Sequence, residues 1–149
     1  QNLNLGIKKL GWKIDFRRFR KYLMEKYSVV TAYYFIGYVP GNQPLYSELQ
    51  KAGFVLVFKP TIPGCDGSVK GNIDADLVLQ AMIDLDNYDF ALIVSSDGDF
   101  YSLVKYLYQN KKLRFVMSPY IETCSTLLKR EAKEKIVFMV NLRARLEYK

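Results

Sequence analysis

Histidine is absent from this chain of 149 residues. That absence excludes Ser-His-Asp and Cys-His nucleophilic devices and zinc sites that use histidine ligands. Cysteine is scarce, and because Cys65 and Cys124 lie far apart and form no CxxC pair, neither a zinc cluster nor a disulfide framework is supported. We therefore expect a protein of the reducing cytoplasm whose chemistry uses other groups.

Long apolar runs are also lacking. Runs such as 90–94 and 136–140 are far shorter than the roughly 20 residues that cross a bilayer, so we expect no membrane span. The glycine-rich Walker loop is missing, which argues against nucleotide hydrolysis by that route. With 50% hydrophobic and 25% charged residues, the chain should be globular, and its length fits one domain over residues 1–149.

The two signs of charge are segregated along the chain. Residues 66–99 contain eight aspartates and one base, Lys70, for a local charge of −7. Because the whole chain carries +7, the remainder carries +14. A basic body around an acidic centre suits a protein that attracts a polyanion and holds divalent cations, although it could also serve solubility alone.

Hydrophobic periodicity alternates between the two element types. We expect helices at 15–27, 43–51 and 123–133, strands at 31–39, 54–58, 90–95, 113–117 and 135–140, a loop at 60–71, and a last helix capped by Asn141. Two further helices are expected, one capped by Asn72 with the inward stripe Leu77, Val78, Ala81, Met82 and Leu85, and one after the turn 97–99 with the stripe Phe100, Leu103, Val104 and Leu107. The apolar runs 54–58 and 90–95 predict parallel strands covered on both faces. This order predicts a three-layer α/β/α fold with a mostly parallel central sheet, whose ligands bind beyond the carboxyl ends of the strands.

Acidic side chains occur where such a fold places its ligands. Asp97 and Asp99 follow the predicted strand at 90–95, while Asp74 shares the inward helical face of Leu77 and Val78. Buried carboxylates without a partner are costly, and a bound cation would neutralise them. An all-oxygen ligand set selects Mg²⁺ or Mn²⁺.

Two alternative roles for these acids stay open. Aspartates at helix N-termini also cap free amides and favour the helix dipole, so the group could consist of conventional caps. A phosphoacceptor or phosphatase that uses Asp97 as its nucleophile is a further alternative, although Asp97 does not begin the expected DxDx(T/V) pattern.

Three blocks of the sequence carry a family resemblance, namely residues 1–3, 70–74 and 95–100, which read QNL, KGNID and SSDGDF. In this order and spacing they resemble the NYN domain family, the LabA-like branch of the PIN-like nuclease superfamily. The resemblance covers essentially the whole chain and implies a metal-dependent ribonuclease. The family's first strand ends in an Asp, which we expect to lie just upstream of Gln1, so that this chain is N-terminally truncated.

The resemblance implies a set of site residues. Asp74, Asp97 and Asp99 would be catalytic metal ligands, Asn2 would orient the first Asp or a metal water, and Ser95, Ser96 and, as a weaker candidate, Asp76 would support them. The expected cofactor is Mg²⁺ or Mn²⁺, and the products would carry a 5′-phosphate and a 3′-hydroxyl.

Basic residues near the N-terminus would attract single-stranded or structured RNA. The candidate nucleic-acid-binding residues are Lys8, Lys9, Trp12 (for stacking on a base), Lys13, Arg17, Arg18, Lys21 and Lys70. A plain basic surface and a core tryptophan are the alternatives. Homo-oligomerisation is a further expectation, and a catalytically inactive nucleic-acid-binding module of the same fold is the alternative function.

Overall fold

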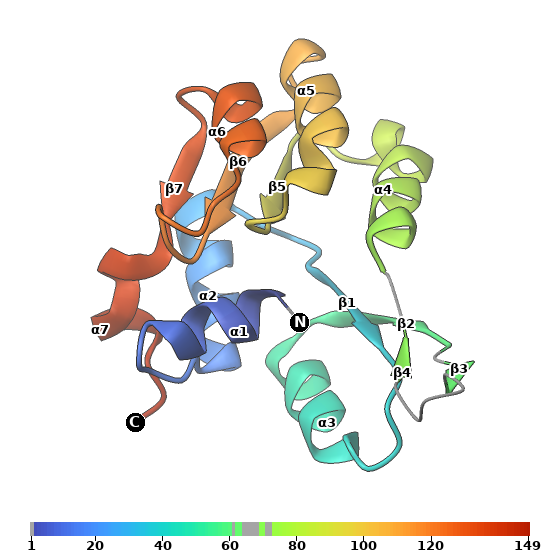
Figure 1. The fold of residues 1–149 in the computed structure, drawn as a ribbon, viewed down its shortest axis with the longest axis vertical. Coiled ribbons are helices and arrows are strands. Elements are labelled where there is room, and N and C mark those ends of the chain that lie inside the picture. Colours follow the sequence, from blue (N-terminus) through green and yellow to red (C-terminus); the bar gives the residue numbers. More distant parts are fainter. Residues whose placement is uncertain (1, 61, 64–68, 71–72) are drawn as a thin grey trace. The chain divides into compact units, whose positions relative to one another are not determined.

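The protein is described by a computed structural model that covers residues 2–60, 62–63, 69–70 and 73–149 (Figure 1). The helices are α1 (Asn2–Lys9), α2 (Phe16–Tyr27), α3 (Gln43–Ala52), α4 (Asp74–Ile83), α5 (Tyr101–Gln109), α6 (Thr126–Ala132) and α7 (Arg143–Leu146). The strands are β1 (Tyr33–Gly37), β2 (Val55–Lys59), β3 (Ile62–Pro63), β4 (Val69–Lys70), β5 (Ala91–Val94), β6 (Leu113–Ser118) and β7 (Ile136–Phe138). Short 3-10 turns are η1 (Leu85–Asn87), η2 (Gly98–Phe100) and η3 (Met139–Leu142). The predicted α/β class is confirmed.

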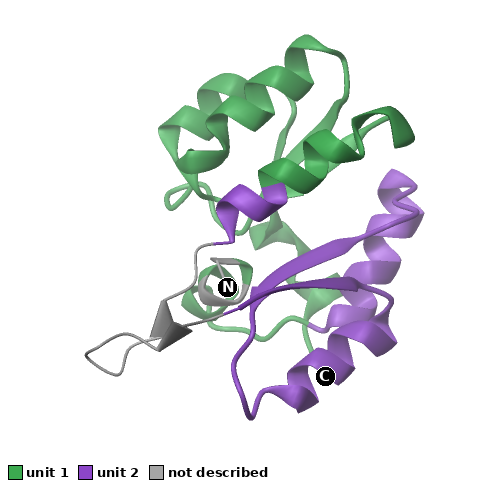
Figure 2. Cartoon of the chain, turned by 90° about the vertical axis from the view of Figure 1, so that its right-hand side faces the viewer, with its two compact units in different colours: residues 1–14, 78–148 green, residues 15–77, 149 purple. Residues whose placement is uncertain are grey.

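The chain divides into two compact units (Figure 2). Unit 1 contains residues 1–14 and 78–148, and unit 2 contains residues 15–77 and Lys149. No helix among the described residues is long and apolar enough to cross a bilayer. The expectation of one domain over the whole length stays a prediction.

Unit 2 is built around helix α2, whose predicted start at Asp15 is confirmed. The Asp15 carboxylate accepts hydrogen bonds from the backbone amides of Arg17 (2.9 Å) and Arg18 (3.1 Å), which caps the helix. The buried face of α2 begins with Phe16, whose ring forms T-shaped pairs with the rings of Tyr34 and Phe54, at centroid distances of 5.9 Å and 6.3 Å. Strands β1 and β2 pair in parallel and are joined through α3, as a parallel pair requires.

Unit 1 contains the parallel sheet β5-β6-β7, in which α5 and α6 connect successive strands. The predicted apolar stripe of α5 is confirmed, since Leu103, Val104 and Leu107 are buried. Because all three strands run in the same direction, the segments that leave β5, β6 and β7 start at one edge of this sheet. That edge is where the sequence predicts the functional site.

Burial differs from the prediction at two strands and one helix. The run 54–58 was expected to be covered on both faces, yet Val55 and Phe58 are exposed, and Phe90 lies exposed just before β5. The stripe of α4 was expected to be buried, but no side chain of this helix is buried, and Met82 of that stripe is 38% exposed. These predictions are wrong because apolar periodicity identifies the side chains suited to burial but not whether a neighbour covers them.

Local boundaries also differ. The expected loop at 60–71 contains the antiparallel pair β3-β4. Residues 61, 64–68 and 71 of this loop lie outside the described part of the chain, as does the proposed helix cap Asn72. Helix α1 was not predicted. Leu142 rather than Asn141 occupies the N-cap position of the last helix and makes no side-chain cap, because η3 first takes up residues Met139–Leu142.

Candidate metal centre

The turn after β5 brings two carboxylates to the edge of the sheet. Ser95 is buried, and its Oγ accepts a hydrogen bond from the Asp97 backbone amide at 3.1 Å. The Asp97 Oδ1 in turn accepts from the Asp99 backbone amide at 2.9 Å, so Asp97 caps η2. Asp97 therefore does act as a helix cap, as the alternative role predicts. The cap uses its Oδ1 only.

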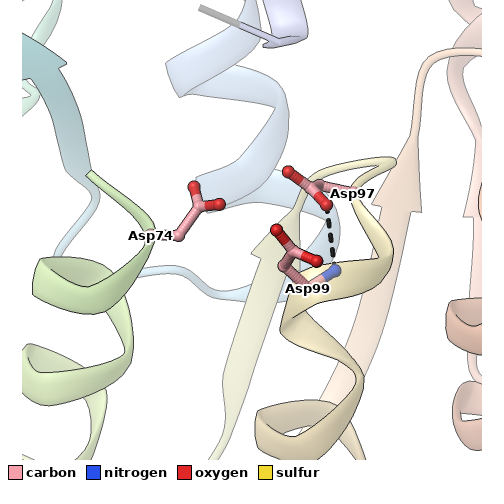
Figure 3. Close-up of side chains that lie close together, drawn as sticks. All are labelled: Asp74, Asp97 and Asp99. Atoms are coloured by element: carbon pink, nitrogen blue, oxygen red, sulfur yellow. Dashed lines mark hydrogen bonds between the residues drawn. The ribbon is translucent and has the colours of Figure 1, made fainter. Parts of the chain in front are cut away.

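Asp74, in the first turn of α4, is the third acid of this group. One carboxylate oxygen of each aspartate lies within 4.8 Å of the others, and Figure 3 shows the three side chains pointing toward one another. Asp74 and Asp97 are half-buried, and Asp99 is exposed. Three like charges at this spacing repel one another, and an oxygen-preferring cation would relieve that repulsion. The group could therefore hold a metal ion.

The turn is anchored to the neighbouring helix α6. The backbone amide of Ser125 donates to the Ser96 carbonyl at 3.0 Å, and the Ser125 Oγ caps α6 by accepting from the amide of Leu127 at 3.2 Å. Sequence reasoning missed Ser125, although a serine before Thr126 and two leucines is a helix-start signal. The helix begins at Thr126, three residues later than the predicted start at Thr123.

Gly98 packs directly against this anchor. A Cβ added at Gly98 would lie 3.1 Å from the Ser125 Cβ and would overlap its Oγ. Gly98→Ala should therefore lower the free energy of unfolding by about 1 to 2 kcal/mol, within the usual range for overpacking. Chemical denaturation measures the change.

A second substitution tests the cause of that change. Gly98→Ala combined with Ser125→Gly removes the overlapping side chain, and glycine at an N-cap costs only a few tenths of a kcal/mol relative to serine. The double variant should therefore be more stable than Gly98→Ala alone. If the double variant lost as much free energy of unfolding as the two single variants together, the close contact between Gly98 and Ser125 would not be the cause.

The remaining predicted site residues have different placements. Ser96 supplies its carbonyl to Ser125, and Asp76 lies half-buried on α4 but outside the acidic group. Asn2 begins α1 and Lys70 ends β4, but their side chains lie outside the described residues. Their predicted roles stay predictions.

The predicted nucleic-acid-binding residues divide by exposure. The exposed ones are Lys8, Lys9, Lys13, Arg17 and Lys21, whereas Arg18 is half-buried and pairs with Asp15 at 3.7 Å. The Lys13 ammonium lies 4.8 Å from the Tyr148 ring centroid. Trp12 is only 6% exposed, so it is a core side chain with little surface for stacking, which corrects the prediction and agrees with the alternative of a core tryptophan.

Comparison with known proteins gives a family and a similar structure. The family model described as the NYN domain matches residues 1–139. The crystal structure of a protein of unknown function from Vibrio parahaemolyticus RIMD 2210633 is similar, with a TM-score of 0.78 and 28% identity over 93% of this chain and 87% of that chain. No curated protein matches the chain.

The family match covers nearly the whole chain and includes the turn that carries Asp97 and Asp99. The similar crystal structure is consistent with a PIN-like α/β/α fold. The LabA-like branch stays a prediction. The three acids converge within the part of the chain that the family model matches, and the match over residues 1–139 shows that the chain belongs to the NYN domain family.

Proposed function

We propose that the protein is a ribonuclease that hydrolyses RNA phosphodiester bonds at a Mg²⁺ or Mn²⁺ site formed by Asp74, Asp97 and Asp99. The observation that carries the proposal is the convergence of three carboxylate oxygens within 4.8 Å at the strand edge of an NYN domain. The NYN family belongs to a nuclease superfamily, which supports nuclease activity as the class of function.

The ligand set decides which ion fits. All three donors are carboxylates, and hard divalent cations prefer oxygen ligands. A bound ion would act as a Lewis acid: it would activate water and neutralise the charge that develops on the phosphate. No histidine is needed for this chemistry, which agrees with a chain that contains none.

The chain's own residues hold this arrangement in place. Ser95 accepts from the Asp97 amide, and Asp97 accepts from the Asp99 amide, so the turn backbone is held and the Asp97 carboxylate is positioned on it. We assign to Asn2 the orienting role that the family pattern implies. The exposed bases Arg17 and Lys21 line a hollow of about 290 Å³ on unit 2 and supply charge for RNA.

An assay with a labelled single-stranded RNA tests the proposal. The protein is incubated with the RNA in Mg²⁺, in Mn²⁺ and in EDTA. Cleavage in either metal that stops in EDTA, with 5′-phosphate and 3′-hydroxyl products, is the expected result. Binding without cleavage would select the inactive module, and a covalent phosphate on Asp97 would select the phosphoacceptor.

Metal binding should also be visible as stabilisation. Mn²⁺ at about ten times its dissociation constant should raise the free energy of unfolding by about 1.4 kcal/mol, because only the folded state gathers the three acids. Thermal unfolding with and without EDTA measures the effect.

The variant Asp99→Asn provides the comparison. It should bind Mn²⁺ more weakly, and in EDTA it should be at least as stable as the wild type because one of three repelling charges is gone. The exposed Asp89, which precedes β5 and lies outside the acidic group, provides the matched control Asp89→Asn. Equal Mn²⁺ stabilisation in all three proteins would contradict the assignment of the ligands.

A further inference from the structure

Unit 1 contains a hollow of about 450 Å³ at the same strand edge as Asp97. Gly6, Lys9 and Leu10 line it from α1 and the turn that follows, Tyr120 and Thr123 line it from the segment after β6, and Val140 lines it from η3. Its volume falls within the range of small-ligand sites, which is roughly 300 to 1,000 Å³. The hollow is therefore large enough to hold a ligand of its own.

The hollow is linked to the acidic turn through the backbone. Tyr120 follows β6, Val140 follows β7, and Asp97 follows β5, and these parallel strands end at one edge of the sheet. Thr123 lies two residues before Ser125, whose amide donates to the carbonyl of Ser96 at 3.0 Å. Ligands of parallel α/β sheets bind at this edge.

The lining favours a flat ring that is attached to an anion. Leu10 and Val140 provide apolar walls, and Tyr120 adds an aromatic ring whose side chain is hydrogen-bonded to Glu122. Thr123 adds a hydroxyl, which donates to the Tyr120 carbonyl at 3.3 Å. Lys9 is exposed and follows Lys8 in the last turn of α1, so the cationic side of the hollow faces solvent. A nucleobase with its phosphate combines the ring and the negative charge that these walls suit.

We propose that this hollow, the base pocket, holds one unpaired base of a single-stranded RNA, with Lys9 on a neighbouring phosphate. The inference rests on the proposed function for its choice of RNA. It adds a binding element that the acidic group does not provide, because carboxylates repel the phosphate backbone and cannot retain RNA by themselves.

Binding measured in EDTA tests the base pocket without requiring cleavage. A labelled 10-nucleotide single-stranded RNA is titrated with the wild type, with Val140→Trp, which fills the pocket, and with Tyr120→Leu, which removes the aromatic wall. Each variant should lose about tenfold in affinity, the order expected for one stacked base. Circular dichroism checks that both variants are folded, and Val140 is partly exposed, so a larger side chain there is tolerable.

A charge-matched pair separates the base pocket from general electrostatic attraction. Lys9→Ala removes a lining cation, whereas Lys105→Ala removes an exposed cation of α5 outside the pocket. The first should weaken binding severalfold more than the second. Equal losses from both, with unchanged affinity in Val140→Trp, would overturn the base pocket.

A crosslinking experiment locates the base directly. RNA that carries 4-thiouridine is irradiated with the protein in EDTA, and the attached peptides are identified by mass spectrometry. Crosslinks to the segments that contain Tyr120 or Val140 support the proposal, and crosslinks confined to other segments overturn it.

Failure of the pocket can be told from failure of the proposed nuclease. Loss of RNA affinity in the pocket variants supports the base pocket even if no metal promotes cleavage. If the wild type cleaves RNA in a metal-dependent way but the pocket variants keep the wild-type RNA affinity, the base pocket is overturned and the proposed nuclease activity is supported.

Discussion

Asp97→Asn should lower the rate of metal-dependent RNA cleavage by at least about a hundredfold, which corresponds to about 2.7 kcal/mol of lost transition-state stabilisation. The amide removes one negative charge from the group of three and is a much poorer ligand for Mg²⁺. Single-turnover cleavage of a labelled RNA, measured for the wild type and the variant at saturating metal, gives the ratio of rates.

The choice of Asn separates the two roles of Asp97. Its Oδ1 also accepts the hydrogen bond from the Asp99 amide at 2.9 Å, and the side-chain carbonyl of Asn can accept the same bond. Asp97→Asn should therefore keep its folded stability, whereas Asp97→Ala should lose about 1 kcal/mol with the cap. Asp89→Asn is the matched control and should cleave at the wild-type rate. Undiminished cleavage by Asp97→Asn, or cleavage that persists in EDTA, would rule out the carboxylate-metal mechanism.

Tyr34→Phe should make the protein markedly more resistant to alkaline unfolding. Tyr34 is 9% exposed, and its hydroxyl has no hydrogen-bond partner among the described residues. Burial raises the pKa of Tyr34 from 10.0 to about 12, because the phenolate would lose its hydration. Between pH 10 and 12 the unfolded chain loses this proton and the folded chain keeps it. The contribution of Tyr34 to stability is therefore complete below pH 10 and is lost as the pH rises toward 12.

The size of the effect follows from the two pKa values. A difference of about two units corresponds to about 2.7 kcal/mol of stability lost across this interval, and phenylalanine, which does not titrate, should not lose it. At neutral pH the variant should be equal to the wild type or slightly more stable, because the exchange removes an unpaired buried hydroxyl and keeps the ring contacts with Phe16 and Phe54. Urea unfolding of both proteins from pH 7 to pH 12 measures the difference. If the free energies of unfolding of the wild type and the variant fell equally from pH 10 to pH 12, Tyr34 would ionise at its ordinary pKa in the folded protein, and the prediction would be wrong.

Much of the candidate site could be predicted from the sequence. The apolar run before Ser95 identified a strand, and its exit identified Asp97 and Asp99 as edge residues, because parallel strands expose their carboxyl ends to ligands. Asp74 was chosen because it shares a helical face with apolar residues. The structure brings one oxygen of each of the three within 4.8 Å. The local signals were sufficient here because each acid lies next to the start of a helix.

Residues outside local patterns were not predicted. Ser125 anchors the acidic turn from α6, and the base pocket draws on α1, the segment after β6 and η3. Of the residues that line the base pocket, only Lys9 was among the predicted site residues, since the pocket joins residues far apart in the chain. Trp12 shows the converse, because an aromatic residue among bases suggested stacking although its ring is buried.

The sequence by itself determined the α/β class, the order of most helices and strands, and the identity of the acids at the strand edge. Those features follow from periodicity and from short-range capping, which act within a few residues. Only the tertiary structure decided which apolar side chains are covered, as the exposed Val55 and Phe58 demonstrate. It also decided that a hydroxyl of β1 is buried without a partner among the described residues and that a hollow opens at the strand edge of unit 1. Coverage and cavities depend on segments that are distant in the chain, and the period of a single element carries no information about its neighbours.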